Sequence, residues 1–586
     1  MKPEIQTIEQ AIAHATNIAI SGALEEAVAH FLKALQYFGY RADLLTNLGL
    51  TYTRLGRSDE AIHAFRNALL INPQLKEAHL NLGLTLLGQK RFEEAGQCFA
   101  QASHLYPHDP GPHEGLGLIA HQQGYLHKAQ SHYKKALELD PSHDQSRLNL
   151  ANCLLETCDA ELGLSMLKNM VQPGCTDIFL SNYLMALQYS DKVSAEQILN
   201  ETLRLRKKTN AQVREISINS THTPSKLSTR RPRIGFVSAD FKAHPVGWFI
   251  KGVMPWLSES FNVHLYANQT HHDSITVALQ KQVLHWRNIS GLSDAQACEL
   301  IKYDQLDLLI DLSGYTAGHR LGVFEMRAAA KQATWLGYFG TTGVQNMDYI
   351  LLDSEHAPYS HLKNFSEKVV YIDPIRMTFS PPSYAGTISI PPVEINDLIT
   401  FGSFNNTSKI NETTIDLWAR CLQRIPSSRM IIKWKTLIEP TTKNKIRDMF
   451  SKYGIKPARL YFQSASAHDA MFEEYSEVDI ALDTYPFTGG TTTCEALWMG
   501  VPVITMRGDR PVSRQSSAML TTIGLNELIA NTPAEFVEAA ARLSENTTLL
   551  KNLRLSMRDR LLQSPLFNPE QFSKNFTSAL NKIISS

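Results

Sequence analysis

The sequence predicts an α-helical superhelix of short repeats, followed by an α/β part with two Rossmann-like domains. Two observations carry this prediction. A pattern of small and aromatic residues returns every 34 residues in the first third of the chain. After residue 230, short β-branched runs alternate with helical stretches, and the alternation starts again near residue 398. A chain of 586 residues is also too long for one hydrophobic core, so several domains are expected.

The repeat is defined by a triplet of residues that suits the contact between two paired helices. Ala27, Phe31 and Ala34 form its first clear copy. The later copies follow at steps of 34 residues and are Ala61, Phe65 and Ala68; Ala95, Phe99 and Ala102; and Ala129, Tyr133 and Ala136. A first-helix glycine and a closing proline recur in step, at Gly49, Gly83 and Gly117 and at Pro73, Pro107 and Pro141. This is the period of the tetratricopeptide repeat, so we expect a superhelix over residues 8–205, with weaker units at both ends.

Such a superhelix presents a concave groove to peptides or partner proteins. Asn47, Asn81 and Asn149 occupy the same first-helix position of their units, and Gly115 fills it in the third unit. A side-chain amide both donates and accepts hydrogen bonds, so a row of amides can hold a peptide backbone of any sequence. The alternative is that these are solvated polar positions. Protein or peptide acceptors are the expected partners of the repeats, and the same surface can support a homodimer.

The rest of the chain is expected to contain a linker and two α/β domains. Residues 206–230 are polar and lack apolar periodicity, which is typical of a linker. Strand-like runs then mark an N-terminal domain over 231–385 and a C-terminal domain over 386–586, which ends in a closing helix. The runs are RIGFVSAD, FNVHLYAN, LDLLIDLSG, QATWLGYFG, YILLDSE and KVVYID, then LITFGSF, RMIIKW, RLYFQS, DIALDT and VPVITM. Strands separated by helices indicate parallel sheets, whose ligands bind beyond the carboxyl ends of the strands.

The loop after DIALDT holds the strongest signal for a bound anion. Gly490 allows close backbone approach, and Thr491 and Thr492 then open a helix whose free N–H groups and dipole favour a phosphate. Glu495 lies one helical turn further, where a carboxylate can accept hydrogen bonds from the two hydroxyls of a ribose. The alternative is an ordinary threonine cap with a surface glutamate.

Two further loops carry candidate catalytic residues. Lys409, after LITFGSF, can supply the cation that a departing nucleoside diphosphate needs, without a metal. The second half contains no DxD-type motif, so no metal ligands are expected. His244, after RIGFVSAD, precedes Pro245, which holds the histidine backbone extended, and its ring can orient or deprotonate an acceptor hydroxyl. A structural histidine is the equal alternative.

Composition excludes several other classes of protein. The 57 Lys and Arg residues balance the 57 Asp and Glu residues, so we expect neither nucleic acid nor an anionic membrane as a partner. Seven scattered cysteines without a CxxC pair indicate reduced thiols. The first residues lack a signal-peptide pattern, and no apolar run reaches the roughly 18–20 residues that a membrane helix needs. A cytoplasmic protein is expected.

Five motifs follow the repeats in a specific order, namely RIGFVSADFKAHPVG, IDLSGYTAGHRLGVF, ATWLGYFGTTGVQNMDYILLD, FGSFNNTSKIN and DIALDTYPFTGGTTTCEALWMGVPVITM. With these motifs and the repeats, the chain resembles over most of its length the family of O-linked N-acetylglucosamine transferases and SPINDLY proteins. The resemblance implies a GT-B type enzyme that inverts the anomeric centre without a metal or other cofactor. It would transfer a sugar, most simply N-acetylglucosamine from UDP-GlcNAc, to Ser or Thr hydroxyls of proteins.

The resemblance also implies roles for individual residues. His244 matches the acceptor-side histidine of the family, and Lys409 matches the lysine that contacts the diphosphate. Thr491 and Thr492 match the phosphate-binding threonines. The remaining matches concern the nucleotide and are Asn406 just before the lysine, Ser466 and His468 in the loop that contacts the base, and Glu495 at the ribose.

Some residues depart from the animal pattern of the family and leave the donor open. Gly490 replaces a histidine, Met471 a base-stacking histidine, His468 a base-contacting lysine and Phe339 a proline. These features resemble the bacterial and SPINDLY-like branch, which implies GDP-fucose as the rival donor. Two other hypotheses stay open: a repeat scaffold that binds nucleotide without turnover, and a glycosyltransferase for a glycan or small acceptor.

Overall fold

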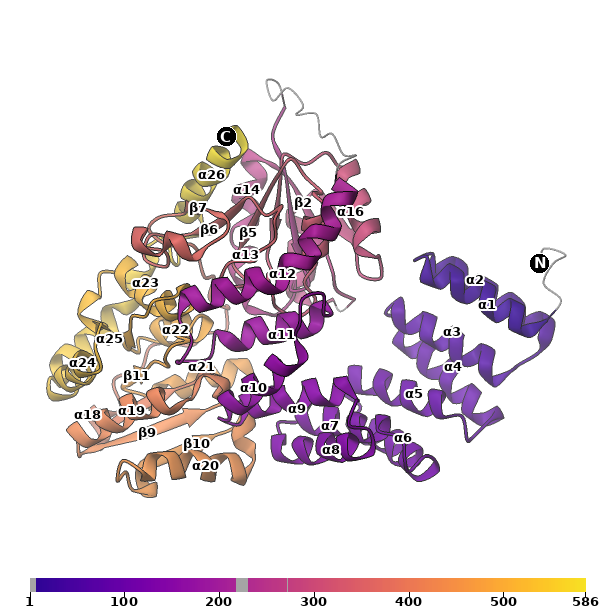
Figure 1. Cartoon of the computed structure of the whole chain (residues 1–586). Helices are drawn as coiled ribbons and strands as arrows, with labels where there is room; N and C mark the ends of the chain where they lie inside the picture. Colours follow the sequence, from indigo (N-terminus) through magenta and orange to yellow (C-terminus); the bar gives the residue numbers. More distant parts are fainter. Residues whose placement is uncertain (1–6, 218–229, 271) are drawn as a thin grey trace. The chain divides into compact units, whose positions relative to one another are not determined.

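A computed structural model describes residues 7–217, 230–270 and 272–586, and for residues 207–217 it describes the backbone alone (Figure 1). The chain forms two compact units. The first comprises residues 1–153 with 290–293, and the second comprises residues 154–289 with 294–586. Each unit is described by itself.

The first unit is an array of helices, each packed against the next along the chain. Its helices, coloured indigo to violet in Figure 1, are α1 (Ile8–Ile20), α2 (Leu24–Phe38), α3 (Ala42–Arg54), α4 (Ser58–Ile71), α5 (Lys76–Gly88), α6 (Phe92–Leu105), α7 (Gly111–Gln122), α8 (Leu126–Leu139) and the start of α9 (Asp144–Glu156). The first helices of neighbouring units also contact each other, as α3 does with α5 and α5 with α7. The predicted helical repeats are confirmed in this unit, whereas residues 154–205 of the range predicted for them belong to the second unit.

The repeat residues act as the sequence predicts. The aromatic residue of each unit is buried, and a Cβ atom added at Gly49 would lie only 2.6 Å from the ring of Phe65. The same relation holds between Gly83 and the ring of Phe99, at 2.7 Å. Glycine is therefore required at the first-helix position that the aromatic ring of the second helix contacts.

In the second unit, the first sheet is parallel, with strand order β3-β2-β1-β4-β5-β6-β7. Its strands are β1 (Arg233–Ser238), β2 (Asn262–Ala267), β3 (His285–Asn288), β4 (Leu308–Asp311), β5 (Lys331–Trp335), β6 (Tyr349–Leu352) and β7 (Lys368–Tyr371). The central strand β1 sets Ile234 beside Val263 of β2 and Leu308 of β4. The strand β3 was not predicted, because its short run HWRN is polar and lacks β-branched residues.

The second sheet is also parallel, with strand order β10-β9-β8-β11-β12-β13. Its strands are β8 (Ile399–Ser403), β9 (Ser428–Lys433), β10 (Leu460–Gln463), β11 (Ile480–Leu482), β12 (Val503–Met506) and β13 (Ile529–Ala530). All five strands predicted for this half are present, and β13 was missed because it has only two residues. Two parallel sheets of this kind confirm the predicted Rossmann-like, GT-B type architecture.

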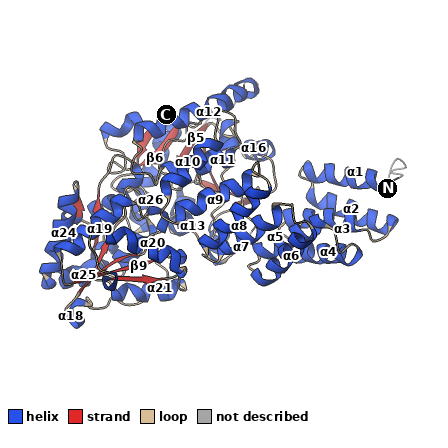
Figure 2. Cartoon of the chain, turned by 60° about the horizontal axis from the view of Figure 1, so that its bottom comes forward, coloured by secondary structure: helices blue, strands red, loops and turns tan. Residues whose placement is uncertain are grey.

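Helices surround the strands of both sheets (Figure 2). Those of the first half are α13 (Pro245–Lys251), α14 (Met254–Ser260), α15 (Ser274–Gln282), α16 (Asp294–Tyr303) and α17 (Leu321–Glu325), with the 3-10 turn η1 (Tyr359–Asn364). Those of the second half are α18 (Val393–Asn396), α19 (Glu412–Arg424), α20 (Pro440–Ser451), α21 (His468–Glu474), α22 (Thr491–Trp498), α23 (Gln515–Thr522), α24 (Pro533–Glu545), α25 (Thr547–Leu562) and α26 (Pro569–Ser585). The 3-10 turns of this half are η2 (Thr407–Lys409), η3 (Lys435–Ile438), η4 (Pro457–Arg459), η5 (Tyr475–Glu477), η6 (Pro511–Arg514) and η7 (Asn526–Leu528).

The last helix, α26, returns to the first sheet. It packs against α14 and β7, and the ring of Phe576 lies 4.4 Å from that of Trp335 in β5. Figure 1 shows the carboxyl end of the chain beside β6 and β7. The closing helix thus joins the two α/β domains into one unit.

The helices that follow the repeats belong to this second unit. They are α10 (Ala160–Met170), α11 (Asp177–Leu187) and α12 (Ala195–Ser217). The helix α12 covers the first residues of the segment 206–230 that was expected to be a linker, and residues 218–229 lie outside the described part of the chain. In the described residues no helix is long and apolar enough to cross a membrane.

Candidate functional site

Lys409 lies at the carboxyl end of β8, in the turn η2. Its Nζ atom donates hydrogen bonds to Oδ1 of Asn405 at 3.1 Å and to the carbonyl oxygen of Thr488 at 2.9 Å. The same atom lies 4.5 Å from the centre of the Phe487 ring. Burial lowers the pKa of Lys409 to about 8, although the nearby carboxylate of Asp483 acts in the opposite direction. The sequence therefore places a poorly hydrated cation where ligands of a parallel sheet bind.

The helix α22 begins beside this lysine. Gly490 is its N-cap, and Thr491 and Thr492 form its first turn. Oγ1 of Thr492 donates to Oδ1 of Asn405 at 3.1 Å, so Asn405 accepts from both Thr492 and Lys409. The helix start and the ammonium group are thereby joined into one positively polarised surface, which suits a phosphate group.

Asp483, the residue after β11, fixes the loop that carries Gly489 and Gly490 before α22. Its Oδ1 atom accepts from the N–H of Gly489 at 2.7 Å, and its Oδ2 atom accepts from Oγ1 of Thr505 at 2.8 Å. A Cβ atom on Gly489 would lie 2.2 Å from Oγ1 of Thr493, so only glycine fits there. Burial raises the pKa of Asp483, and the hydroxyl and N–H donors around it act in the opposite direction.

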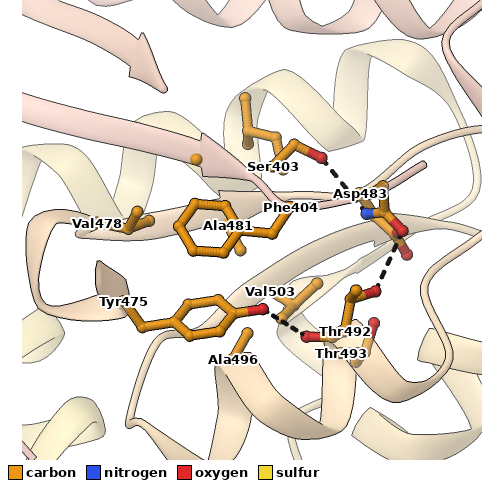
Figure 3. A pocket seen from close by; sticks show the side chains of 13 residues that line it. Ser403, Phe404, Tyr475, Val478, Ala481, Asp483, Thr492, Thr493, Ala496 and Val503 are labelled. Carbon is orange, nitrogen blue, oxygen red and sulfur yellow. Dashed lines mark hydrogen bonds between the residues drawn. The ribbon is translucent and has the colours of Figure 1, made fainter. Parts of the chain in front are cut away.

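A small pocket lies directly beneath these groups (Figure 3). It is lined by residues of β8, β11, β12, α22 and η5 and by residues that follow the strands, among them Phe404 after β8 and Asp483 after β11. The hydroxyl of Tyr475 donates to the carbonyl oxygen of Thr492 at 3.2 Å across this pocket. The pocket is too small for a sugar nucleotide and has room for a water molecule, so it belongs to the support of the site.

Glu495, on the next turn of α22, forms a pair with His468, the first residue of α21. Oε1 of Glu495 lies 3.0 Å from Nε2 of His468, and Nδ1 of His468 lies 2.6 Å from the hydroxyl of Tyr384. The rings of Phe472 and Trp248 lie 5.2 and 6.1 Å from that of His468. Burial raises the pKa of Glu495, and the hydrogen bond from His468 opposes this effect. A carboxylate and three aromatic rings thus surround one imidazole.

His244 ends the loop after β1 and is the N-cap of α13. Its Nδ1 atom lies 3.4 Å from the N–H of Val246, from which it accepts, and 3.6 Å from Oδ2 of Asp240. Burial lowers the pKa of His244, and the Asp240 carboxylate acts in the opposite direction. The helix α13 also carries Trp248, so it connects His244 with the ring of His468.

Asn406 and Ser466 make local contacts. Oδ1 of Asn406 accepts from the N–H of Ser408 at 3.0 Å and caps the turn η2. Oγ of Ser466 donates to Oε2 of Glu474 at 3.0 Å, and the same oxygen pairs with Nζ of Lys433 at 2.8 Å. Both residues lie in loops at the carboxyl ends of their strands, as predicted, but the side chain of Asn406 is occupied within its own loop and that of Ser466 by the last residue of α21.

The three asparagines of the repeats are partly buried in the first unit. Nδ2 of Asn47 donates to the carbonyl oxygen of Asp43 at 2.9 Å, and Nδ2 of Asn81 donates to that of Glu77 at 2.7 Å. Asn149 differs, because its Oδ1 and Nδ2 atoms lie 3.4 Å from side-chain atoms of Gln145 and Glu114 respectively. Asn47 and Asn81 therefore share one orientation, which Asn149 does not.

Several side chains of this site were missed in the sequence analysis. Asn405 and Phe487 stand in the very loops that were selected, but nothing in the residue types singles them out. Tyr384 lies in an irregular stretch between the two sheets, where no periodicity marks it. In the described part of the chain, no group of three or more His, Cys, Asp or Glu residues is placed to hold a metal ion.

Comparison with known proteins gives a consistent result along the chain. Residues 207–379 and 393–576 match the family described as glycosyl transferase family 41. Residues 46–110 and 113–143 match tetratricopeptide repeat families. A solved structure of a mutant O-GlcNAc transferase from Thermobaculum terrenum superposes with a TM-score of 0.71 at 27% identity, covering 93% of this chain and 97% of that one.

Curated relatives match the α/β part. The probable UDP-N-acetylglucosamine–peptide N-acetylglucosaminyltransferase SPINDLY of Petunia hybrida is 36% identical over 361 residues, which are 60% of this chain and 39% of the petunia protein. The corresponding protein SEC of Arabidopsis thaliana is 26% identical over 365 residues, which are 60% of this chain and 37% of that protein. The match thus spans about two fifths of the length of these relatives.

Proposed function

Because this chain belongs to glycosyl transferase family 41, we propose that it transfers a sugar from a nucleoside diphosphate to Ser or Thr hydroxyls of proteins. The observation that carries this proposal is the surface formed by Lys409, Asn405 and Thr492 at the start of α22. Loss of a nucleoside diphosphate develops negative charge on phosphate oxygens. A fixed ammonium group and a helix N-terminus stabilise that charge in the transition state more than in the ground state.

We therefore assign the stabilisation of the departing diphosphate to Lys409 together with Thr491 and Thr492. The reaction needs no metal on this scheme, because the lysine and the helix dipole supply the positive potential that a divalent ion would otherwise supply. The carboxylate of Glu495 accepts from the ribose hydroxyls, for which His468 must give up or share its hydrogen bond.

UDP-GlcNAc is the proposed donor. The support comes from the relatives, since the petunia and Arabidopsis proteins are named as transferases of N-acetylglucosamine from UDP-N-acetylglucosamine. GDP-fucose is the second candidate, favoured by the SPINDLY-like residues Gly490, Met471 and His468. The bases differ in size and hydrogen-bond pattern, and the ring cluster around His468 is the place where we expect them to be distinguished.

The acceptor hydroxyl is proposed to approach from the side of His244. The lowered pKa of His244 keeps its ring neutral at pH 7, as a proton acceptor must be. For Nε2 to accept the proton of a Ser or Thr hydroxyl, the neutral ring must carry its own proton on Nδ1, which exchanges the hydrogen bond from the N–H of Val246 for one to Oδ2 of Asp240. The hydroxyl oxygen attacks the anomeric carbon as the bond to the diphosphate breaks, which inverts that centre. The repeats would hold the polypeptide that carries the hydroxyl.

Two measurements on the purified full chain test this proposal. Calorimetry against UDP, GDP and their sugars should give tight binding for one nucleotide only. Transfer of a radiolabelled sugar to protein acceptors should then proceed in excess chelator. Activity that chelation abolishes and Mg²⁺ or Mn²⁺ restores would contradict the metal-free scheme. Nucleotide binding without any transfer would favour the scaffold hypothesis.

A further inference from the structure

A tyrosine from the helical part of the second unit packs on the loop that carries the anion site. Tyr189 lies between α11 and α12, and its ring stacks on that of Phe487, with centres 4.8 Å apart and planes at 22°. Phe487 belongs to the loop between β11 and α22 and is buried. The stretch of chain that follows the repeats therefore contributes a side chain to the immediate support of the α/β site.

Polar contacts on both sides of Tyr189 fix its position. The buried guanidinium of Arg510 donates to the carbonyl oxygens of Leu187 at 3.1 Å and Ser190 at 2.8 Å. Oγ1 of Thr413 donates to the carboxylate of Asp191. The turn that carries Tyr189 is thus anchored to the second α/β domain at three points, and a buried arginine bound to carbonyl groups is costly to detach.

Phe487 contacts both Tyr189 and Lys409. Its ring centre lies 4.5 Å from the Nζ atom of Lys409, and the next residue, Thr488, accepts a hydrogen bond from that atom. On another side, the Phe339 ring lies 5.3 Å from that of Phe487 at 74°. Phe487 is therefore held between aromatic neighbours while it touches the ammonium group.

We propose that Tyr189 is a positioning residue for sugar transfer, which acts by holding Phe487 against the Lys409 ammonium group. The inference rests on the proposed role of Lys409 at the diphosphate. A lysine has a flexible stem with four rotatable bonds, and only two hydrogen bonds restrain its end here. The ring excludes water and attracts the cation, so it narrows the positions that the ammonium group can take. Without the ring of Tyr189, Phe487 can tilt away and water can reach Lys409.

The test compares Tyr189→Ala with Tyr189→Phe in the full-length protein. We expect Tyr189→Ala to lower kcat for sugar transfer by about tenfold, the loss of one cation–ring contact and the alignment that it gives. Tyr189→Phe keeps the stacking ring and should restore the rate. The pH profile supplies the readout that simple destabilisation would not change. In the parent, kcat/KM should fall as pH rises through the pKa of Lys409, about 8. Tyr189→Ala should admit water to Lys409 and so raise the pKa of the lysine. The fall of kcat/KM on the alkaline side, which we call the alkaline limb, should therefore move to higher pH.

A control on the helix that precedes Tyr189 separates positioning from loss of stability. Tyr183 of α11 is buried and donates to Glu201 at 3.1 Å, away from Phe487. Tyr183→Ala should lower the melting temperature yet leave the alkaline limb in place. Combination with Lys409→Met gives the decisive comparison, because Tyr189→Ala should cause no further loss once the ammonium group is gone.

The outcomes are distinct. Parent-like rates and an unmoved limb in Tyr189→Ala would overturn the proposal. A tenfold loss that persists in the Lys409→Met background would also overturn it, because Tyr189 would then act by another route. A fully active Lys409→Met enzyme would overturn the proposed role of Lys409 itself, and only that result bears on the proposed function.

Discussion

The carboxylate of Glu495 is hydrogen-bonded to His468, with 3.0 Å between Oε1 and Nε2. The proposed ribose ligand is therefore engaged before any nucleotide arrives. His468 is itself held through Nδ1 by the hydroxyl of Tyr384. Donor binding must exchange one of these hydrogen bonds for a ribose hydroxyl, so the affinity for the nucleotide depends on the charge of Glu495.

Glu495 should make nucleotide binding pH-dependent on the acid side. Burial raises its pKa above the ordinary value of a glutamate. As the pH falls through that raised pKa, the carboxylate takes up a proton and loses acceptor capacity, so affinity should fall. Calorimetry of the nucleoside diphosphate over this range measures the effect. Glu495→Gln should bind several-fold more weakly at pH 7, about 1 kcal/mol for one charged hydrogen bond, and its affinity should not change with pH.

His468→Ala provides the matched control for this prediction. The histidine lowers the pKa of Glu495 by its hydrogen bond and charge, so its removal should raise that pKa further. The acid limb of the binding curve should then move to higher pH. An acid limb that is the same in His468→Ala, Glu495→Gln and the parent would show that another group controls binding.

Lys409→Met removes the charge of the lysine and keeps most of its apolar stem. We expect sugar transfer to fall by about a hundredfold to a thousandfold, as when a preorganised charge stabiliser is lost. The melting temperature should stay level or rise, because the buried cation is itself costly, as its lowered pKa shows. Initial rates and thermal unfolding of the same preparation test both parts. A Lys409→Met variant as fast as the parent would contradict the proposed role of Lys409 in stabilising the departing diphosphate.

The sequence predicted the fold well wherever a pattern was local. Glycine and a ring recur in step because each repeat packs the same two positions together, as Gly49 and Phe65 show. The missing fourth asparagine has a similar cause, since a Cβ atom at Gly115 would lie 2.4 Å from the ring of Phe99. The return of α26 to the first sheet could not be predicted, because Phe576 and Trp335 meet only in the folded chain.

The site was predictable to the level of its loops and not of every side chain. Residue type and position after a strand selected Lys409, Thr492 and Glu495, which the structure brings to the carboxyl ends of the neighbouring strands β8 and β11. The family resemblance pointed to Asn406, whereas its neighbour Asn405 is the one hydrogen-bonded to Lys409 and Thr492. Adjacent residues of one type differ only in the direction of their side chains, which the turn η2 decides.

Glu355 should hold the two α/β domains together. It follows β6 of the first sheet, and its carboxylate accepts from Arg507 at 2.6 Å, Arg514 at 3.3 Å and Ser517 at 2.9 Å, all from the second domain. Glu355→Ala leaves two arginines without their carboxylate and should lower the free energy of unfolding by about 2–3 kcal/mol. Chemical denaturation measures the loss.

An exposed ion pair gives the comparison for this effect. Glu394 pairs with Lys551 at 2.7 Å on the surface of the second domain. Glu394→Ala should cost less than about 1 kcal/mol, since solvent screens such pairs. Equal losses in the two variants would show that Glu355 acts as one more surface charge and does not hold the domains together.

The asparagines of the repeats should affect the protein acceptor and leave the chemical step unchanged. Asn47 and Asn81 each use one amide N–H on a carbonyl group of their own helix, which fixes the side chain and leaves the amide oxygen to accept from a bound peptide. Each such bond contributes about 0.5–1.5 kcal/mol, so a single replacement can escape detection and three together should not. The change is therefore the triple variant Asn47→Ala, Asn81→Ala and Asn149→Ala. Transfer to full-length protein acceptors should weaken at least tenfold, while hydrolysis of the donor, which needs no peptide, should match the parent.

Asn67→Ala, on the second helix of a repeat, serves as the control and should leave both rates unchanged. Parent-like transfer by the triple variant would assign the repeats to assembly, and a parallel fall in donor hydrolysis would show that the replacements disturb the catalytic part.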